Sequence, residues 1–370
     1  MKVVVIGAGI VGASVAYRLA RAGASVTILE ARWVGSGTSS ASLAWINANN
    51  KPPRSYHELN AAGLRAHEAL REEFPGMSWW HRDGNVEWAV DVAARTALGR
   101  RIARLREWGY AAEEITARRL GELEPDIDPG PLRGASIAYF PEEGWLDPVV
   151  YAHAMVEAAI GAGARLLVHE PVREIRRTGE RVVGVTTGGG QRHDADCVVN
   201  CAGRWANDVA GEVGLGIPLA PTMGLLAITP PVPVRLRVVV HAPCCQVRPD
   251  GGGRLMVQAD DTDEMMTPET LPSAALEPAA DIVRRAARLL PGIEGVGPEA
   301  VRIGTRAYPA DGFSAVGPLP GVTGYYLAVT HSGVTMAPAL GTIIADEIVL
   351  DREDARLATF RPGRFSAERS

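Results

Sequence analysis

The sequence predicts an α/β fold in which a Rossmann-like, nucleotide-binding domain is interrupted by an α+β domain built on a mainly antiparallel sheet. Three observations support this prediction: a glycine-rich strand-to-helix junction near the amino terminus, a new series of strands and helices from residue 145, and proline-rich connections between strands from residue 218. We expect the nucleotide-binding domain to comprise residues 1–45, 145–217 and 300–370. Residues 46–144 and 218–299 would form the inserted domain.

The amino-terminal junction has the residues that a dinucleotide-binding turn needs. An apolar strand over residues 2–6 runs directly into Gly7-Ala8-Gly9-Ile10-Val11-Gly12. Gly7 allows a tight turn, Gly9 lets a pyrophosphate approach the backbone, and Gly12 lets the next helix pack closely on the sheet. The amides of that helix then face the phosphates. Glu30 ends the second strand and can accept hydrogen bonds from ribose hydroxyls.

The composition is that of a soluble globular protein. The 370 residues are 46% hydrophobic and carry a formal net charge of -5, so the chain can bury a large core and has no broad positive charge to attract nucleic acid. We find no metal-ligand motif and no apolar run of membrane-spanning length, and therefore expect no nucleic-acid, metal or membrane partner. The chain has four cysteines, Cys197, Cys201, Cys244 and Cys245, and so small a number favours a reducing, cytoplasmic location. Cys197 and Cys201 are expected to be buried.

Later segments alternate between helix and strand patterns. A helix is expected over residues 148–162, capped by Asp147 and begun by Pro148. Short strands follow, with a glycine hairpin turn at residues 188–190. The expected strands are 165–168, 182–185, 197–200, 237–241, 254–258 and 324–329, and the expected later helices are 279–290 and 333–350.

Further motifs occur in a fixed order along the chain. They are Gly37-Thr38-Ser39-Ser40-Ala41-Ser42, Gly144-Trp145-Leu146-Asp147-Pro148, and the segments 198–206, 304–312 and 331–338. With the amino-terminal junction, they make the chain resemble, from end to end, the FAD-dependent amine oxidases of the D-amino-acid oxidase, glycine oxidase and sarcosine oxidase group. The resemblance implies an FAD-binding domain, an inserted substrate domain and oxidation of a C–N bond.

Residue chemistry and the resemblance together indicate where FAD would bind. Hydroxyls and amides after Gly37 can bond phosphate and ribityl oxygens, and a helix that begins near Ser332 can stabilise negative charge on reduced flavin. Val172 resembles the position where the family's backbone meets adenine. Trp205 either contacts the cofactor or only packs beneath the turn at Gly203. The expected cofactor-binding residues are Gly7, Ala8, Gly9, Ile10, Val11, Gly12, Glu30, Ala31, Arg32, Thr38, Ser39, Ser40, Ser42, Leu43, Val172, Ala202, Gly203, Trp205, Arg306, Ser332, Gly333, Val334, Thr335 and Met336.

We expect the FAD to be bound non-covalently. Covalent attachment in some relatives requires a cysteine near the carboxy terminus or a histidine after the second cofactor stretch. In this chain all four cysteines precede Gln246, and the segment Leu43-Ala44-Trp45 contains no histidine.

Arg306 is the expected contact for a substrate carboxylate. On a regular strand it would share one face with Arg302, Gly304 and Tyr308, and a guanidinium can bind a carboxylate through two parallel hydrogen bonds. The matching arginine in the glycine oxidase pattern has this role. An interdomain salt bridge is the alternative for Arg306, and Arg302 is the alternative contact.

Other residues would complete the substrate pocket. His331 touches the flavin edge or the substrate, or is structural. Cys245 lies near the position where the family strand often offers a tyrosine, which indicates a roomier, more apolar pocket. The expected substrate-binding residues are Arg306, Cys245, Tyr308 and His331.

These features predict an oxidase of an amino acid or an N-substituted glycine. Hydride would pass from the alpha carbon to the flavin, the imine would hydrolyse to an oxo acid and an amine, and O2 would reoxidise the flavin with release of H2O2. No side chain stands out as an obligatory acid or base, so none is assigned. The alternatives are an FAD-dependent 2-hydroxy-acid dehydrogenase and a non-catalytic FAD-binding subunit.

Overall fold

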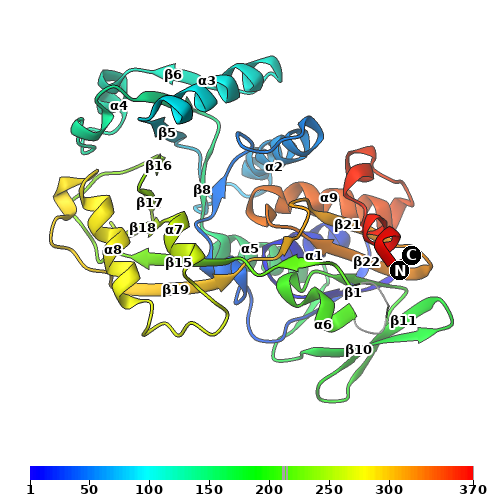
Figure 1. The fold of residues 1–370 in the computed structure, drawn as a ribbon. Helices are drawn as coiled ribbons and strands as arrows, with labels where there is room; N and C mark the ends of the chain where they lie inside the picture. Colours follow the sequence, from blue (N-terminus) through cyan, green and yellow to red (C-terminus); the bar gives the residue numbers. More distant parts are fainter. Residues whose placement is uncertain (211–212, 214–215, 370) are drawn as a thin grey trace.

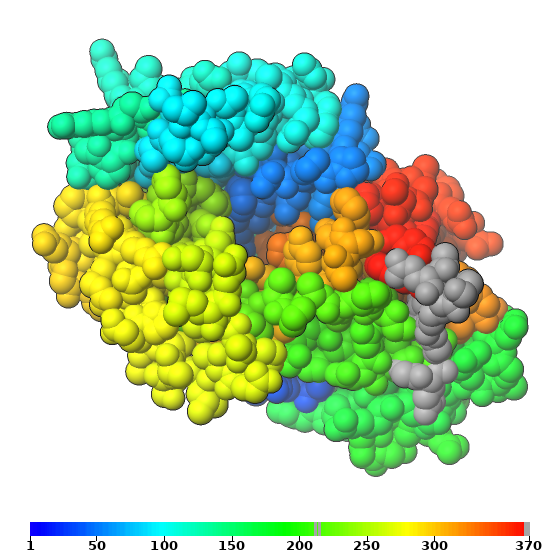
Figure 2. All heavy atoms as spheres, in the orientation of Figure 1, coloured from blue at the N-terminus to red at the C-terminus, as the bar shows by residue number. Residues whose placement is uncertain are grey.

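The computed structural model describes residues 1–210, 213 and 216–369. Within them the strands form sheets of nine, eight, three and two strands. The ribbon in Figure 1 shows the two large sheets in separate halves of the molecule, with β1 and β22 in one half and β15 to β19 in the other. In the space-filling view of Figure 2, these halves adjoin along the face that carries the yellow and green segments.

The nine-stranded sheet has the amino-terminal strand near its centre. Strand β1 (Lys2–Ile6) lies between β2 (Ser25–Leu29) and β13 (Cys197–Asn200) and is parallel to both. Its run of Val and Ile is buried on both faces, as expected for an inner parallel strand. The remaining strands are β22 (Val322–Val329), β11 (Arg181–Thr187) and β10 (Val172–Thr178) beyond β13, β9 (Arg165–Leu167) beyond β2, and β12 (Arg192–Asp194) and β21 (Ala315–Leu319) off this path.

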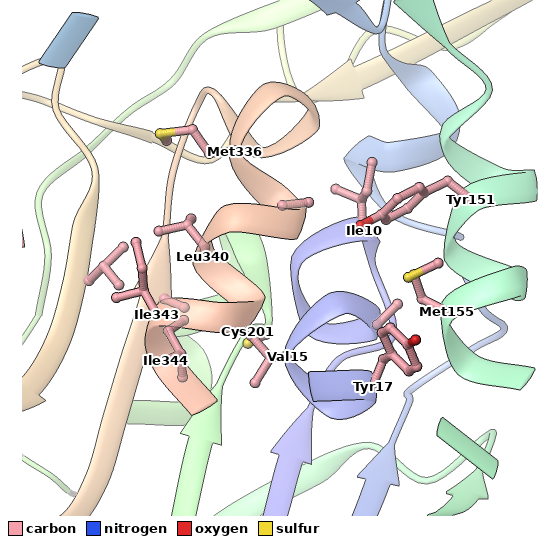
Figure 3. Packing of buried hydrophobic residues seen from close by; sticks show 14 of the residues in the cluster. Ile10, Val15, Tyr17, Tyr151, Met155, Cys201, Met336, Leu340, Ile343 and Ile344 are labelled. Carbon is pink, nitrogen blue, oxygen red and sulfur yellow. The ribbon is translucent and has the colours of Figure 1, made fainter. Parts of the chain in front are cut away.

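Three helices pack side by side against this sheet. Figure 3 shows α1 (Ile10–Arg21) between α5 (Pro148–Gly161) and α9 (Gly333–Leu350), with Tyr151 and Leu340 pointing into the shared core. A Cβ atom at Gly341 would lie 2.8 Å from the carbonyl oxygen of Ser14, so a glycine is needed for α1 and α9 to approach so closely. Helix α2 (Arg54–Glu73) packs on the other side of α9.

Helix α9 has the length and composition of a membrane-spanning helix, contrary to the prediction from the sequence. It is the one helix in the described part of the chain that is long and apolar enough to cross a membrane, so the prediction that no run reaches that length was wrong. However, 61% of the helix is buried inside the protein, where it contacts α1 and α2. Its apolar residues therefore belong to the core shown in Figure 3.

The eight-stranded sheet is mixed. Strand β16 (Val239–Ala242) runs parallel to β5 (Asn85–Ala89) and antiparallel to its other neighbour, β17. Because the sheet is mixed, the predicted mainly antiparallel sheet is not confirmed in that form. The full order is β19 (Ala300–Thr305), β15 (Met223–Ile228), β18 (Leu255–Gln258), β17 (Cys245–Pro249), β16, β5, β7 (Ser136–Phe140) and β6 (Glu113–Ile115). Around it lie α3 (Val92–Glu107), α4 (Ala117–Leu123), α7 (Asp260–Glu264) and α8 (Leu276–Ala287).

The short elements connect the two halves. Strand β8 (Gly144–Leu146) pairs with β3 (Trp45–Ile46) and β4 (Trp80–His81), and β14 (Leu219–Ala220) pairs with β20 (Tyr308–Pro309). Helix α6 (Ala206–Ala210) follows the turn after β13.

Most predicted elements are confirmed with small changes at their ends. Asp147 caps α5 by accepting hydrogen bonds from the amides of Val149 and Val150 at 3.2 and 3.1 Å, as predicted. Helix α9 has the predicted bounds, whereas α8 starts and stops three residues before the predicted 279–290. Cys197 and Cys201 are buried, and this burial raises the pKa of both thiols to about 12.

One predicted strand is wrong. Arg302, Gly304, Arg306 and Tyr308 do not share the face of a single strand, because β19 ends at Thr305 and Tyr308 starts β20 in another sheet. The amide of Arg306 still donates to the carbonyl oxygen of Thr222 at 2.9 Å, in register with the pairing of β15 and β19.

The division into domains stays a prediction. Strand β19 pairs with β15 in the eight-stranded sheet, although it follows the predicted boundary at residue 300. The predicted ranges 145–217 and 300–370 also include residues 211–212, 214–215 and 370, which lie outside the described residues.

Candidate active site

A cavity of about 1210 Å³ extends from the glycine-rich turn to the eight-stranded sheet. It is larger than the 300 to 1,000 Å³, roughly, that is usual for a single small ligand, and so has room for a dinucleotide and a substrate. The predicted site residues that line it are Gly7, Gly9, Ile10, Val11, Glu30, Ala31, Arg32, Thr38, Ser39, Ser42, Leu43, Val172, Ala202, Gly203, Trp205, Cys245, Arg306, His331, Ser332, Gly333, Val334 and Thr335.

Five predicted site residues lie behind this lining. The Ala8 amide donates to Glu30, and Gly12 packs against the turn. Ser40 donates back to the carbonyl oxygen of Gly37 at 3.0 Å. The other two are Met336, which is fully buried in the core of Figure 3, and Tyr308, whose ring meets His331 edge-on with centroids 4.5 Å apart.

Steric limits explain the two outer glycines of the turn. Gly7 has φ +94°, and a Cβ there would lie 2.7 Å from the carbonyl oxygen of Cys201. A Cβ at Gly12 would lie 2.0 Å from the carbonyl oxygen of Gly7, so only glycine lets α1 start this close to β1. By contrast, a Cβ at Gly9 would approach only the Ser39 hydroxyl, at 3.4 Å. The backbone at Gly9 therefore faces the cavity, as a dinucleotide cradle requires.

Glu30 is held where a ribose would be recognised. Its carboxylate accepts hydrogen bonds from the amides of Ala8 at 2.7 Å and Arg32 at 2.8 Å. These bonds connect the glycine turn to the end of β2 and fix the carboxylate at the edge of the cavity.

The hydroxyl-rich stretch bridges the two halves of the site. The Ser39 hydroxyl accepts a hydrogen bond from the amide of Ile10 at 3.1 Å, and the Thr38 hydroxyl donates to the carbonyl oxygen of Thr305 at 2.7 Å. Trp205 lines the cavity and also packs on Gly37, where a Cβ would lie 3.2 Å from the ring. The position of Trp205 is compatible with the predicted cofactor contact, whereas the packing partner of its ring is Gly37 and not the predicted turn at Gly203.

The amino end of α9 is open toward the cavity. No side chain caps the helix at Ser332, and Ser332, Gly333 and Thr335 all line the cavity. The free amides and the positive end of the helix dipole would stabilise negative charge placed there. Neighbouring segments fix this helix end, because the Tyr56 and Ser332 hydroxyls are hydrogen-bonded at 2.9 Å and the Asn47 amide donates to the Thr335 hydroxyl at 3.2 Å.

Arg306 lines the cavity but already has an acidic partner. Its Nη2 group forms an ion pair with Asp263, whose side chain is 6% exposed. Asp263 also accepts hydrogen bonds from the Leu225 amide and from Gln258, both at 2.7 Å. The alternative predicted for Arg306, a salt bridge, is therefore present and fixes one edge of the guanidinium. Its Nε and Nη1 groups have no hydrogen-bond partner within the described residues, and the carboxylate contact stays a prediction.

The surroundings of both cavity histidines favour the neutral imidazole. Burial lowers the pKa of His241 to about 3, and its ring packs on Trp45 with centroids 4.0 Å apart. His331 is exposed to the cavity; desolvation by the cavity walls lowers its pKa, and the positive charges of Lys51 and Arg306 act in the same direction.

Cys245 lies in the wall of the cavity beside a second thiol. It is 2% exposed, and its Sγ atom is 3.9 Å from that of Cys244. Cys244 lies in the turn between β16 and β17, and Cys245 begins β17, whereas the sequence predicted a strand over residues 237–241 only.

Several cavity residues were not predicted. Trp45 belongs to β3, and Asn47, Asn50 and Lys51 come from the segment that follows it. Other polar groups come from the eight-stranded sheet and its helices: Glu87, Arg101, His241, Gln258, Asp261 and Arg285. The polar run Asn47-Ala48-Asn49-Asn50-Lys51 between apolar segments was the available sequence signal. The residues around β16 and α7 carry no such signal, because the fold alone brings them to the cavity.

The fold and this cavity define an oxidoreductase of the dinucleotide-binding class, with a substrate chamber beside the cofactor cradle. The chain belongs to the family described as "FAD dependent oxidoreductase", which matches residues 2–347. FAD is therefore its cofactor, and the glycine turn, Glu30 and the open end of α9 provide the contacts that FAD needs.

Known proteins that are similar to the chain include glycine oxidases. The chain is 28% identical over 367 residues to the glycine oxidase of Geobacillus kaustophilus (strain HTA426), covering 97% of this chain and 95% of that protein. The crystal structure of glycine oxidase from Geobacillus kaustophilus superimposes with a TM-score of 0.83, covering 98% of each chain at 27% identity. The chain is also 27% identical over 368 residues to a 4-methylaminobutanoate oxidase (formaldehyde-forming) of Paenarthrobacter nicotinovorans, covering 94% of this chain and 44% of that protein.

Proposed function

We propose that this protein oxidises the C–N bond of an amino acid or an N-substituted glycine. The observation that carries the proposal is the position of Arg306, which lines the same cavity as the glycine turn and the end of α9. A guanidinium beside the cofactor can bind a substrate carboxylate and so fix the position of the alpha carbon. The names of the related glycine oxidases and of the 4-methylaminobutanoate oxidase support the same substrate class.

In this proposal, each part of the chain has a separate task. Asp263 holds one edge of Arg306, and the other edge binds the substrate carboxylate. The amino end of α9 stabilises negative charge that develops on the cofactor. FAD, when bound, accepts hydride from the alpha carbon and is reoxidised by O2, which yields H2O2. Water then hydrolyses the released imine to an oxo acid and an amine.

Two further features belong to the proposal. The small Cys245 in place of a larger polar residue supports a substrate bulkier than glycine. We also propose non-covalent FAD and a reducing, cytoplasmic location, the latter supported by four free cysteines in the structure.

Anaerobic mixing of the FAD-loaded protein with panels of D-amino acids, N-substituted glycines and 2-hydroxy acids tests this function. Bleaching of flavin absorbance by an amine, followed by H2O2 when air is admitted, is the expected result. Bleaching by 2-hydroxy acids alone would instead assign a 2-hydroxy-acid dehydrogenase. A bound flavin that no compound reduces would favour a non-catalytic FAD-binding subunit.

A further inference from the structure

Lys51 is a basic residue of the cavity that no ion pair neutralises in the described part of the chain. It lines the cavity with Asn47, Asn50 and His331. The arginines on the side of the eight-stranded sheet are each paired with a carboxylate: Arg101 with Glu87, Arg285 with Asp261, and Arg306 with Asp263. The Lys51 amine is half-buried in the cavity where the substrate is proposed to bind, and no carboxylate among the described residues forms an ion pair with it. Its position therefore cannot be explained by a structural ion pair.

A buried network holds the backbone that carries Lys51. Glu143 is fully buried and accepts hydrogen bonds from Trp45 at 3.1 Å, from Asn49 at 3.0 Å and from the Tyr110 hydroxyl at 2.6 Å. The Tyr110 hydroxyl also accepts from the Ala48 amide at 3.2 Å. The segment that leads to Lys51 is therefore fixed at several points, and the lysine is presented to the cavity from a rigid base.

We propose that Lys51 is the proton acceptor that converts the ammonium group of the bound substrate into a neutral amine before oxidation. The neutral amine of Lys51 takes one proton from the substrate nitrogen, which keeps the electron pair of the broken N–H bond. Lys51 becomes an ammonium group and later returns the proton to water. This inference rests on the proposed oxidation of an amine, because hydride loss from the alpha carbon requires a lone pair on nitrogen.

The surroundings favour Lys51 over the other titratable groups of the cavity. Burial lowers the pKa of Lys51 to about 8, although the nearby charge of Glu143 opposes this shift. The pKa of His241 is about 3, so this imidazole is too weakly basic, and the pKa of His331 is lowered by desolvation and by the charges of Lys51 and Arg306. The Cys244 thiol also lines the cavity, with a pKa lowered to about 7 by its hydrogen bond with Cys245, but that thiol has a partner 3.9 Å away, whereas the Lys51 amine has no ion-pair partner among the described residues. The carboxylates on the side of the eight-stranded sheet are already paired with arginines. A base with a pKa close to the working pH is efficient in proton transfer.

The first test is the pH dependence of flavin reduction at low substrate concentration, with Lys51→Met and Lys51→Arg as a matched pair. In the wild type, the second-order rate constant is expected to rise about tenfold per pH unit below a pKa near 8. In both variants this rise of the rate constant with pH is expected to disappear, and flavin reduction should be slower by about 10²- to 10⁴-fold, because neither methionine nor a guanidinium can accept the proton. If Lys51→Arg keeps the wild-type rate, Lys51 acts as a fixed positive charge and the proposal is overturned.

A second test measures the pKa of Lys51 without turnover. Competitive acetylation of the FAD-loaded protein at a series of pH values, with mass spectrometry of each lysine peptide, should give half-maximal reactivity of Lys51 near pH 8. Glu143→Gln should lower that value, because it removes the negative charge that favours the ammonium form while the amide can still accept from Trp45 and Asn49. A pKa near the ordinary 10.5 of lysine would contradict the proposal.

These tests separate failure of the base role from failure of the proposed function. If no amine reduces the wild-type flavin, the oxidation itself is rejected and the proton transfer with it. If amines reduce the flavin of the wild type, and Lys51→Met keeps both the rate constant and its pH dependence near pH 8, only the role of Lys51 is rejected.

Discussion

Gly63 is the point where α2 meets the cofactor end of α9, and its replacement by alanine should disturb both stability and FAD binding. A Cβ at this position would lie 2.3 Å from the carbonyl oxygen of Thr335, 2.9 Å from its carbonyl carbon and 3.1 Å from the Cα of Met336. All three are backbone atoms, so no side-chain rotation relieves the overlap. One helix must move by about 1 Å to restore ordinary contact.

Such a shift has a cost that can be estimated. Overpacking of a closely packed helix contact costs about 1 to 3 kcal/mol, and the better helix propensity of alanine returns up to about 1 kcal/mol. We therefore expect Gly63→Ala to lower the free energy of unfolding by about 1 to 2 kcal/mol. Residues 332–335 line the cavity, so the displaced helix end would also lose part of a dipole interaction worth about 0.3 to 1 kcal/mol. FAD affinity should fall by up to about fivefold.

Thermal denaturation of the FAD-free protein and fluorescence titration with FAD measure the two effects separately. Gly99→Ala is the matched control, since Gly99 lies within α3 and a Cβ there would have no atom within 4 Å. The control should be neutral or more stable by up to about 1 kcal/mol, with unchanged FAD affinity. If Gly63→Ala matched the control in both measurements, the close contact between α2 and α9 would limit neither the stability of the protein nor its affinity for FAD.

Four further tests address the site and its supports, two with substitutions and two with the wild type. Arg306→Ala should raise KM for a carboxylated substrate about 30-fold or more, corresponding to at least about 2 kcal/mol for a truncated charge pair, and an unchanged KM in steady-state assays would transfer the carboxylate contact to another residue. Asp147→Ala should lower the free energy of unfolding by about 1 kcal/mol in chemical denaturation, because two amides of α5 lose their cap, whereas Asp147→Asn should be close to the wild type. Acid precipitation should release FAD into the supernatant, and flavin absorbance in the pellet would show covalent attachment. Comparable turnover of glycine and a long-chain N-alkylglycine would remove the support for a roomier pocket at Cys245.

The sequence was sufficient for the cofactor side of the molecule because the physical requirements there are local. Gly7 and Gly12 cannot carry a Cβ without meeting backbone atoms a few residues away in space, and these restrictions leave a fixed pattern in the sequence. The cap at Asp147 and the bounds of α9 also depend mainly on residues within one turn of helix. Patterns of this kind can be recognised without knowledge of the tertiary structure.

The substrate side depends on contacts between distant segments. Arg306 could be recognised as a candidate contact, but its partner Asp263 lies 43 residues earlier in a short helix with three other acidic residues, none of which the sequence singles out. The prediction that Arg306 continues a regular strand failed for a related reason. The amide of Arg306 still bonds to Thr222 in the register of β15, but Pro221, opposite Ala307, has no amide to donate, and Tyr308 pairs with Ala220 in a separate two-stranded sheet.

Lys51 shows why a catalytic base was not identified from the sequence. A lysine after three asparagines has the composition of an exposed loop, and its ordinary pKa would keep it protonated at neutral pH. Its lowered pKa comes from burial in the cavity, and the carboxylate of Glu143, which follows β7 in the chain, opposes that shift. Only the folded chain brings these groups together. A search for the base in proteins of this fold should therefore begin with cationic groups in the cavity that lack a carboxylate partner, because an arginine paired with a carboxylate cannot exchange a proton near neutral pH.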